Sequence, residues 1–467
     1  MAGIKKTILR LAFALGLLVA SAMGVFAEDV KIETDESALF GDAEEGVEKV
    51  AEEAKGKAVQ TFLKTETVRI GGTYTGTLES AFTWTDPWYG NRDPLAPEKK
   101  TLLPTADAKV FFDARPNDYT RYYGSVKAFW PYKDSSNFQL FELFTDFNWN
   151  DQFNFRFGKH TVKWGVGYFW SPADVINVAA IDVTDPTAQR EGPVNLRLHV
   201  PIANTQNNIW AYAILPRIGS TADAAKIEPD DLAFAAKYEF LVGNYEIGAG
   251  AYYRRDYAPK AMLTATGSLW RLNLFGEAVA SWGSDKTWVT DAATLSTTKH
   301  IDGVYFSGTA GFSYVNSTEN INAFFQYFYN GDGYEDADRK SLISQARTAL
   351  SVAPTASVSE TLTLALKGLI YQSGKHYAGA YLSKAEAGST KLTLSILAIA
   401  NLSDLSGFVQ PSVSWEFFER CYLAFSPSFY WSTDALWGAG KDGEYVVIAG
   451  GPSITLSLKA TLGSGSF

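Results

Sequence analysis

The feature that most restricts the fold of this chain is an alternation of apolar and polar residues with a period of two. It begins at Val68 and is clearest in residues 68–75, 245–254 and 321–327. Successive side chains of a β-strand point to opposite faces, so this period predicts strands that separate two different environments. Repeated segments of about ten such residues, divided by turn residues, are typical of transmembrane β-barrels.

The connections between the predicted strands alternate in length. Starting from a first strand at about 68–84, the longer connections are 85–101, 132–137, 165–192, 217–230, 255–260 and 284–300, and the tight turns fall at 115–118, 150–151, 204–206, 243–244, 270–271 and 316–319. A barrel with short turns at one end and long loops at the other explains this alternation, whereas a β-sandwich or a propeller does not.

We therefore predict an all-β fold, a transmembrane antiparallel β-barrel of about 18 strands, with an even total between 16 and 20. Residues 332–374 leave two alternatives open, one large loop with a helix or an additional hairpin that includes the alternating residues 361–367. The last strands are predicted at His376–Leu382, Leu392–Ala400, Phe408–Phe417, Tyr422–Trp431 and Tyr445–Leu462.

The first 27 residues have the pattern of a secretory signal peptide. Basic residues precede an apolar run from Leu11 to Val19, and Val25-Phe26-Ala27 places small residues where cleavage after Ala27 requires them. Residues 28–66 are acidic and predict an amphipathic helix at about 42–62. This segment either packs on a partner or on itself, or is a solvated linker. The predicted domains are thus a signal peptide (1–27), an acidic periplasmic segment (28–66) and a barrel (67–467).

Composition excludes several classes of protein. The net charge of −10 argues against a nucleic-acid partner, and the single cysteine, Cys421, excludes an intramolecular disulfide. The four histidines are scattered, no stretch after the signal peptide reaches about 18 apolar residues, and no GxSxG or HExxH motif is present. We predict no catalytic residues, no cofactor and no metal site, with a calcium ion at the acidic residues of 332–338 as a remote alternative.

Charged residues fall on the polar side of the predicted strands in equal numbers, eight basic and eight acidic over the first eleven strands. On a face toward hydrocarbon each Arg or Lys would cost about 2–4 kcal/mol at mid-depth, so these side chains are expected to line the lumen. They form either the wall of a diffusion pore or structural salt-bridge ladders. The predicted lumen residues are Arg69, Lys109, Arg115, Arg121, Lys127, Arg156, Lys237 and Arg254, with Glu79, Asp107, Asp113, Glu142, Asp146, Glu239, Glu246 and Glu277.

Aromatic residues cluster near the ends of the predicted strands. Belts of aromatic rings at the membrane interface are their usual role, and a sugar-stacking track inside the lumen is the alternative. The residues concerned are Trp84, Trp88, Phe129, Trp130, Trp149, Phe169, Trp170, Tyr252, Tyr253, Tyr430 and Trp431.

Residues 155–193 carry the most distinctive motif of the chain. A strand that ends in GKHTVKWG is followed by SPADVIN and then by DPTAQREG. In these residues the chain resembles a family of porin-like outer-membrane β-barrels from spirochaetes and proteobacteria, most of which are uncharacterised. The resemblance implies an outer-membrane location and a porin-like role, and it implies no substrate.

We expect the loop after the fifth strand, 165–192, to fold into the lumen and narrow it, because loops rich in charged and aromatic residues often carry function. The alternative is that Trp164 and the Asp-Pro turn anchor this loop to the rim of the barrel. The predicted constriction residues are Lys163, Trp164, Asp174, Asp182, Asp185, Arg190 and Glu191.

The predicted function is passive diffusion of small hydrophilic solutes through the outer membrane of a diderm bacterium, after Sec-dependent export. A surface adhesin or structural barrel with a closed lumen is the main alternative, and an outer-membrane enzyme is a minor one. The expected partners are outer-membrane lipid, the solutes and the barrel-assembly machinery. The solute, the ion selectivity and the oligomeric state stay open.

Overall fold

A computed structural model provides the structure of the chain. It describes residues 61–64, 67–85, 100–133, 136–178, 180–186, 188–215, 228–291, 296–298, 301–351, 372–432, 443–449 and 453–466. The chain divides into two units, Met1–Ala58 and Val59–Phe467, and every described residue belongs to the second. The predicted signal peptide and the predicted helix at 42–62, apart from its last two residues, lie outside the described residues.

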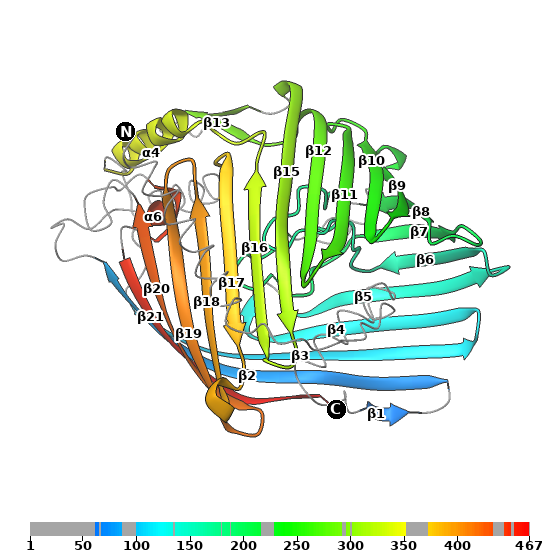
Figure 1. Cartoon of the computed structure of the whole chain (residues 1–467), viewed down its shortest axis with the longest axis horizontal. Helices are drawn as coiled ribbons and strands as arrows, with labels where there is room; N and C mark the ends of the chain where they lie inside the picture. Colours follow the sequence, from blue (N-terminus) through cyan, green and yellow to red (C-terminus); the bar gives the residue numbers. More distant parts are fainter. Residues whose placement is uncertain are drawn as a thin grey trace. The chain divides into compact units, whose positions relative to one another are not determined.

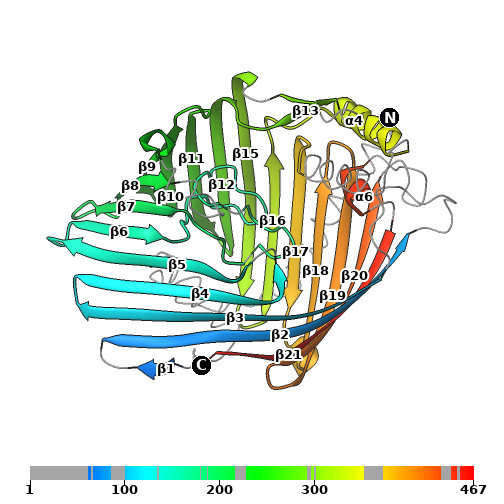
Figure 2. The ribbon, with the colours of Figure 1, turned by 180° about the vertical axis from the view of Figure 1, so that it is seen from behind.

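The described residues form a closed antiparallel β-barrel (Figures 1 and 2). Neighbouring strands pair in sequence order from β2 onward, and β21 pairs with β2, which closes the ring at 18 strands. The prediction of an antiparallel barrel of about 18 strands is confirmed. Closure leaves no unpaired edge in the wall, which is what a barrel in lipid requires.

The barrel strands are β2 (Val68–Thr85), β3 (Lys100–Asn117), β4 (Thr120–Lys133), β5 (Ser136–Trp149), β6 (Phe153–Lys159), β7 (Val194–Pro201), β8 (Asn208–Leu215), β9 (Ala233–Val242), β10 (Tyr245–Arg254), β11 (Lys260–Leu269), β12 (Leu272–Ser284), β15 (Ile301–Asn316), β16 (Ile321–Tyr329), β17 (His376–Lys384), β18 (Leu392–Asn401), β19 (Ser406–Phe418), β20 (Cys421–Ser432) and β21 (Ser453–Ser466). The remaining elements are β1 (Thr61–Lys64), β13 (Trp288–Asp291), β14 (Ser296–Thr298), the 3-10 helices η3 (Pro229–Asp231) and η4 (Ala387–Ser389), and the helices α4 (Asp336–Ser351) and α6 (Glu444–Ala449).

The barrel seam carries one additional short strand. β21 pairs with β2 from Thr73 to Thr85, and β1 pairs with the preceding stretch of β2, from Arg69 to Gly71. Both run antiparallel to β2, so β1 continues the line of β21 beyond its end. The helix expected at about 42–62 does not include residues 61–62, because these lie in β1, where Thr61 pairs with Gly71 of the barrel wall.

Connections at one end, here called the loop end, include 160–193 and 330–375, and those at the other, the turn end, are short. Asn150 and Asp151 in the turn between β5 and β6 both have positive φ, of 57° and 52°, as tight hairpin turns require. Two loop-end connections are also short, two residues between β4 and β5 and four between β18 and β19. The expected alternation of length therefore has two exceptions.

In the part of the segment between β16 and β17 that the structure describes, there is a helix. Tyr329 of β16 lies opposite His376 of β17, so the two strands are direct neighbours, and α4 lies in the connection. This agrees with the alternative of one large loop with a helix. The alternating residues 361–367 lie outside the described residues.

The predicted last strand begins too early. Residues 444–449 form α6, and β21 starts only at Ser453. Tyr445, Val446 and Val447 are all buried, at 2% exposure or less, so this segment has no polar side of the kind that a strand of the wall shows. Among the described residues, no helix is both long enough and apolar enough to cross a membrane.

Candidate functional site

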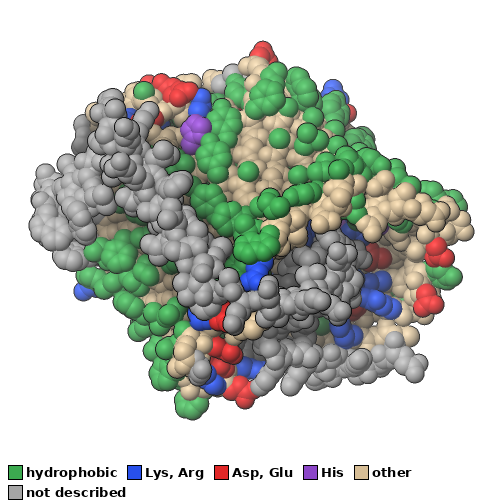
Figure 3. All heavy atoms as spheres, viewed as in Figure 1, with side chains coloured by type: hydrophobic (Ala, Val, Ile, Leu, Met, Phe, Trp, Pro, Cys, Tyr) green, Lys and Arg blue, Asp and Glu red, His purple; other side chains and the backbone are tan. Residues whose placement is uncertain are grey.

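The wall of the barrel has two chemically different faces. On β16, Phe325 and Tyr327 are exposed, whereas Gln326 and Phe328, one residue along in each case, are buried. The same alternation places Tyr74, Leu78 and Phe82 of β2 on the outside. Figure 3 shows hydrophobic and small side chains over the outer face of β15 and β16, with hardly a charged one among them. An apolar outer face is what a barrel presents to hydrocarbon.

Ion pairs link the inner faces of β2 to β6. Arg121 Nε lies 2.8 Å from Asp113 Oδ1, and Arg156 Nε lies 2.6 Å from Asp146 Oδ1. Arg69 and Arg115 also approach Asp113, each at 3.7 Å. Paired in this way, the charges stiffen the wall at the same time as they line it.

Other predicted lumen residues form smaller groups on the inner face. Lys109 Nζ lies 3.9 Å from Glu142, and Lys127 Nζ lies 3.3 Å from the centre of the Phe141 ring. Lys237 pairs with Glu239 at 2.5 Å on β9. Four members remain. Arg254 lies 3.9 Å from Asp231, and Glu246 lies on β10. In the strand register, Glu79 lies opposite Lys459 and Asp107 lies opposite Phe129.

Residues 160–193, here called the lumen loop, connect β6 to β7 and run along the inner wall (Figure 2, teal trace). One group of loop side chains, Val162, Trp164, Ala173 and Ile176, packs in a buried cluster with residues of β8 to β12. A second group, Phe169, Trp170 and Val183, packs with residues of β16 to β19. One loop therefore contacts inward-facing side chains on well-separated parts of the wall.

Glu277, at the middle of β12, holds the lumen loop by its backbone. Its Oε1 accepts hydrogen bonds from Val166 N at 2.5 Å, Gly167 N at 2.7 Å and Ser171 Oγ at 2.8 Å, and its Oε2 accepts one from Ala173 N at 2.9 Å. Glu277 is 5% exposed. A buried carboxylate that accepts four hydrogen bonds holds the loop backbone firmly, because hydrogen bonds to a charged acceptor are stronger than those between neutral groups.

Gln326, on β16, holds the next turn of the loop. Its Oε1 accepts from Tyr168 N at 3.0 Å and Phe169 N at 2.7 Å, and its Nε2 donates to Trp170 O at 2.5 Å. Gly379 on β17 leaves room for Phe169, since a Cβ there would lie 2.6 Å from Phe169 Cδ2. The wall and the loop are thus complementary in shape and in hydrogen bonding.

The predicted constriction residues divide into two groups. Trp164, Asp174, Arg190 and Glu191 hold the loop, and Lys163, Asp182 and Asp185 are exposed. Asp174 pairs with Arg190 and accepts two bonds of 3.0 Å from Asn177 Nδ2. Glu191 pairs with Lys159 and accepts from Gln139 Nε2 at 2.7 Å. Trp164 Nε1 lies 2.6 Å from Met262 Sδ of β11.

Lys163 is the one basic member of the exposed group. Its side chain reaches solvent, yet the surrounding protein lowers its pKa, and the nearby Lys237 acts in the same direction while Glu246 opposes it. Asp182 is turned toward its own backbone and accepts from Thr184 N at 2.9 Å.

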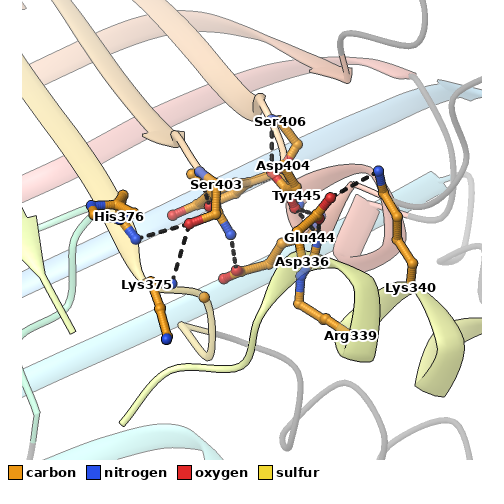
Figure 4. A network of polar contacts seen from close by, with 12 residues as sticks. Asp336, Arg339, Lys340, Lys375, His376, Ser403, Asp404, Ser406, Glu444 and Tyr445 are labelled. Atoms are coloured by element: carbon orange, nitrogen blue, oxygen red, sulfur yellow. Dashed lines mark hydrogen bonds and ion pairs between the residues drawn. The ribbon is translucent and has the colours of Figure 1, made fainter. Parts of the chain in front are cut away.

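A second inward structure lies at the loop end beside β17 to β20 (Figure 4). Glu444 of α6 is fully buried and accepts bonds from Gln372 N at 2.6 Å, Tyr377 Oη at 2.7 Å and Asn401 Nδ2 at 2.7 Å. Its backbone N donates to Asp404 at 2.7 Å, and Asp404 pairs with the buried Arg339 of α4. Burial, with the charge of Asp404, raises the pKa of Glu444 to about 7.

Sequence reasoning did not find this α4–α6 network. Arg339, Asp404 and Glu444 are far apart in the chain, and none lies in a motif. A usable signal was the uninterrupted apolar run 445–448, which fits a segment buried on all sides better than a wall strand.

The described histidines and the acidic residues of 332–338 contact protein groups. His160 is buried with a pKa well below its ordinary value, because burial and the nearby Arg156 and Arg197 disfavour its charged form. His199 stacks on Trp210 at 3.9 Å, and His376 Nδ1 lies 2.7 Å from Tyr327 Oη. In the 332–338 segment, Asp332 accepts from Ser284, Glu335 pairs with Lys375, and Asp336 pairs with Arg339 and Lys340. Within the described part of the chain, no cluster of three or more His, Cys, Asp or Glu residues is arranged to hold a metal ion.

Comparison with known proteins identifies no family, since no family model and no curated protein matches the chain. Among solved structures, it is similar to OccK8 (OprE) of Pseudomonas aeruginosa, with 9% identity over 85% of this chain and 98% of that one, and a TM-score of 0.45. A BenF-like porin from Pseudomonas fluorescens Pf-5 gives 9% identity, 86% and 99% coverage and a TM-score of 0.46. The outer membrane channel DcaP of Acinetobacter baumannii gives 11% identity over 87% of this chain and 99% of that one, with a TM-score of 0.42. These similarities are loose, and the function has to be inferred from the chain's own residues.

Proposed function

We propose that the protein is a porin-like channel of the outer membrane that lets small hydrophilic solutes diffuse passively, with its lumen narrowed by the lumen loop. The observation that carries the proposal is the closed 18-strand wall, apolar outside and charged inside. A barrel of this size is too wide for the side chains of its wall to fill. Its interior is therefore either a water-filled passage or a space occupied by loops.

The lumen loop supports a narrowed passage. Its backbone is bonded to Glu277 and Gln326 at the middle of the wall, well away from the rim. We infer that the exposed Lys163, Asp182 and Asp185 border the remaining opening, while Trp164, Asp174, Arg190 and Glu191 keep the loop in place. Replacing Arg190 or Glu191 would therefore disturb the loop itself, so these two residues are poor probes of selectivity.

A closed barrel that serves as an adhesin or structural protein is the second candidate. The α4–α6 network favours it, because this buried structure occupies the loop end beside β17 to β20. Single-channel recording of the full mature chain in a planar bilayer distinguishes the two. Discrete conductance steps that grow in the Glu277→Ala Gln326→Ala variant support a loop-narrowed channel. A correctly folded barrel, identified by its heat-dependent mobility on a gel, that passes no current would contradict it.

A further inference from the structure

The inner wall of the barrel is chemically divided. Ion-paired side chains crowd β2 to β6 and recur on β9, β10 and β11. The described inward-facing residues of β18, β19 and β20, by contrast, are uncharged except for Glu416 near the turn end. The outward neighbours on these three strands, such as Ile396, Val413 and Phe425, are exposed and apolar, which establishes the inward set. Hydroxyl groups dominate that set.

The hydroxyls form rows that cross several strands. Ser395 lies opposite Ser412, Ser412 Oγ is 2.7 Å from Ser426 Oγ, and Ser426 lies opposite Ser457 of β21. We call the residues of this surface the hydroxyl lane. Its members are Thr393, Ser395, Gln410, Ser412, Ser414, Ser426, Ser428, Thr455, Ser457 and Thr83.

These hydroxyls retain unused hydrogen-bonding capacity. A serine hydroxyl offers one donor and two acceptor sites, so the single bond between Ser412 and Ser426 leaves most of that capacity free for water or solute. Ser395, Ser412, Ser426 and Ser457 are all partly exposed, whereas Ser428 and Thr83, nearer the loop end, are buried. The lane is therefore a surface for exchange of hydrogen bonds and not only internal cross-bracing.

Tyrosines border the lane at both ends. Tyr422 and Tyr430 lie on the same face of β20 with Ala424, Ser426 and Ser428 between them. At about 3.3 Å per residue, the two rings mark off roughly 26 Å of wall. Tyr430 is 5.5 Å from Phe408 and both tyrosines are partly exposed, so ring faces and hydroxyls occur together.

We propose that the hydroxyl lane is the path of uncharged, polyhydroxylated solutes such as sugars and polyols. This inference rests on the proposed channel function and adds the class of solute. A hydroxyl group both donates and accepts hydrogen bonds, so Ser and Thr side chains can form with a sugar the hydrogen bonds that its hydration water formed. Aromatic faces contact the apolar side of a sugar ring. Along β18 to β20, Glu416 is the one charged side chain among the described inward residues, and the charges beside the lane, Lys459 of β21 and Glu79 of β2, lie opposite each other. We therefore expect a charged solute to be held by the ion-paired side of the barrel instead.

The test is liposome swelling with glucose and with gluconate and glucosamine, charged analogues of similar size. The full chain should admit glucose faster than either analogue. The Ser412→Ala Ser426→Ala Ser457→Ala variant, which removes three hydroxyls and almost no volume, should slow glucose entry at least about twofold, the lower end of what one net hydrogen bond provides. Ser80→Ala, on the outer face of β2, is the matched control and should leave the rate unchanged.

The outcomes separate this inference from the channel proposal. If the full chain passes neither ions nor glucose, the channel proposal fails. If it conducts ions but admits glucose no faster than the charged analogues, or if the triple variant admits glucose at the original rate, the lane is not the path of sugars. Tyr422→Leu provides an independent check, since it should also slow glucose entry while leaving ionic conductance in KCl unchanged.

Discussion

Removing the Glu277 carboxylate should release the lumen loop from the barrel wall. Glu277→Ala deletes the acceptor of four hydrogen bonds and leaves the backbone N–H groups of Val166, Gly167 and Ala173 without it. The buried N–H of Ala173 left unsatisfied costs about 1–3 kcal/mol, and each of the part-buried N–H groups of Val166 and Gly167 loses a net bond of about 0.5–1.5 kcal/mol, so the three together cost at least about 2 kcal/mol. Since every ~1.4 kcal/mol is a factor of ten, the docked state of the loop should lose more than about tenfold in population relative to the undocked state.

The assay is single-channel recording, combined with hydrogen exchange of the amides in residues 166–173. Glu277→Ala should show larger or strongly fluctuating conductance and faster exchange of these amides. Glu277→Gln keeps one carbonyl oxygen, so its conductance and its amide exchange rates should lie between those of Glu277→Ala and those of the native chain. Glu319→Gln is the control, because Glu319 lies in the turn between β15 and β16 and pairs with Lys384 of β17. Unchanged exchange and conductance in a folded Glu277→Ala barrel would refute this reasoning.

Three further predictions concern other parts of the lumen. Asp113→Asn should make the channel more anion-selective, measured as a shift of the reversal potential, because a negative charge is removed; unchanged selectivity would count against a luminal Asp113. The same change should lower the midpoint of thermal unfolding, because Arg121 loses its charged partner at 2.8 Å and keeps only the more distant Asp146, at a cost of about 1.5–3 kcal/mol. Gly379→Ala should speed amide exchange at Phe169, since the new Cβ would lie 2.6 Å from its ring, whereas Gly276→Ala, whose Cβ meets only a carbonyl oxygen at 3.4 Å, should not. A folded-state pKa of about 7 for Glu444 means that the folded chain binds more protons than the unfolded chain between about pH 4.5 and 7, so docking of α6 should weaken as the pH rises through that range. Exchange of the amides in residues 443–449, corrected for intrinsic rates, measures this, and Glu444→Gln should abolish the pH dependence.

The wall of the barrel was predictable from the sequence because each strand faces two solvents. Lipid on one side and a polar lumen on the other impose the alternation in residues 245–254 and 321–327 directly on the chain. The same alternation predicts that Arg121 and Asp113 both face the lumen, and the two residues form an ion pair between β3 and β4. It fails for α6, whose described side chains, Glu444 to Val447 and Ala449, are buried, so that no alternation between two environments marks them in the sequence.

The role of individual loop residues was not predictable, because it depends on partners that are distant in sequence. Trp164 contacts Met262, almost a hundred residues later in the chain, and the loop backbone donates hydrogen bonds to Glu277 and Gln326. The aromatic residues illustrate the same limit. Trp130 and Trp149 are exposed at strand ends, as a membrane belt requires, whereas Phe169, Trp170, Tyr252 and Tyr430 face inward, a difference that strand position alone does not reveal.

The most direct test of a loop-narrowed channel is the single-channel conductance of the full mature chain compared with that of the Glu277→Ala Gln326→Ala variant, both refolded and checked for heat-dependent mobility. We expect discrete steps from the native chain and larger steps from the variant, because the loop leaves the wall when both of its fixed points are removed. A folded native barrel that passes no current, or a variant whose steps are identical to those of the native chain, would contradict this account.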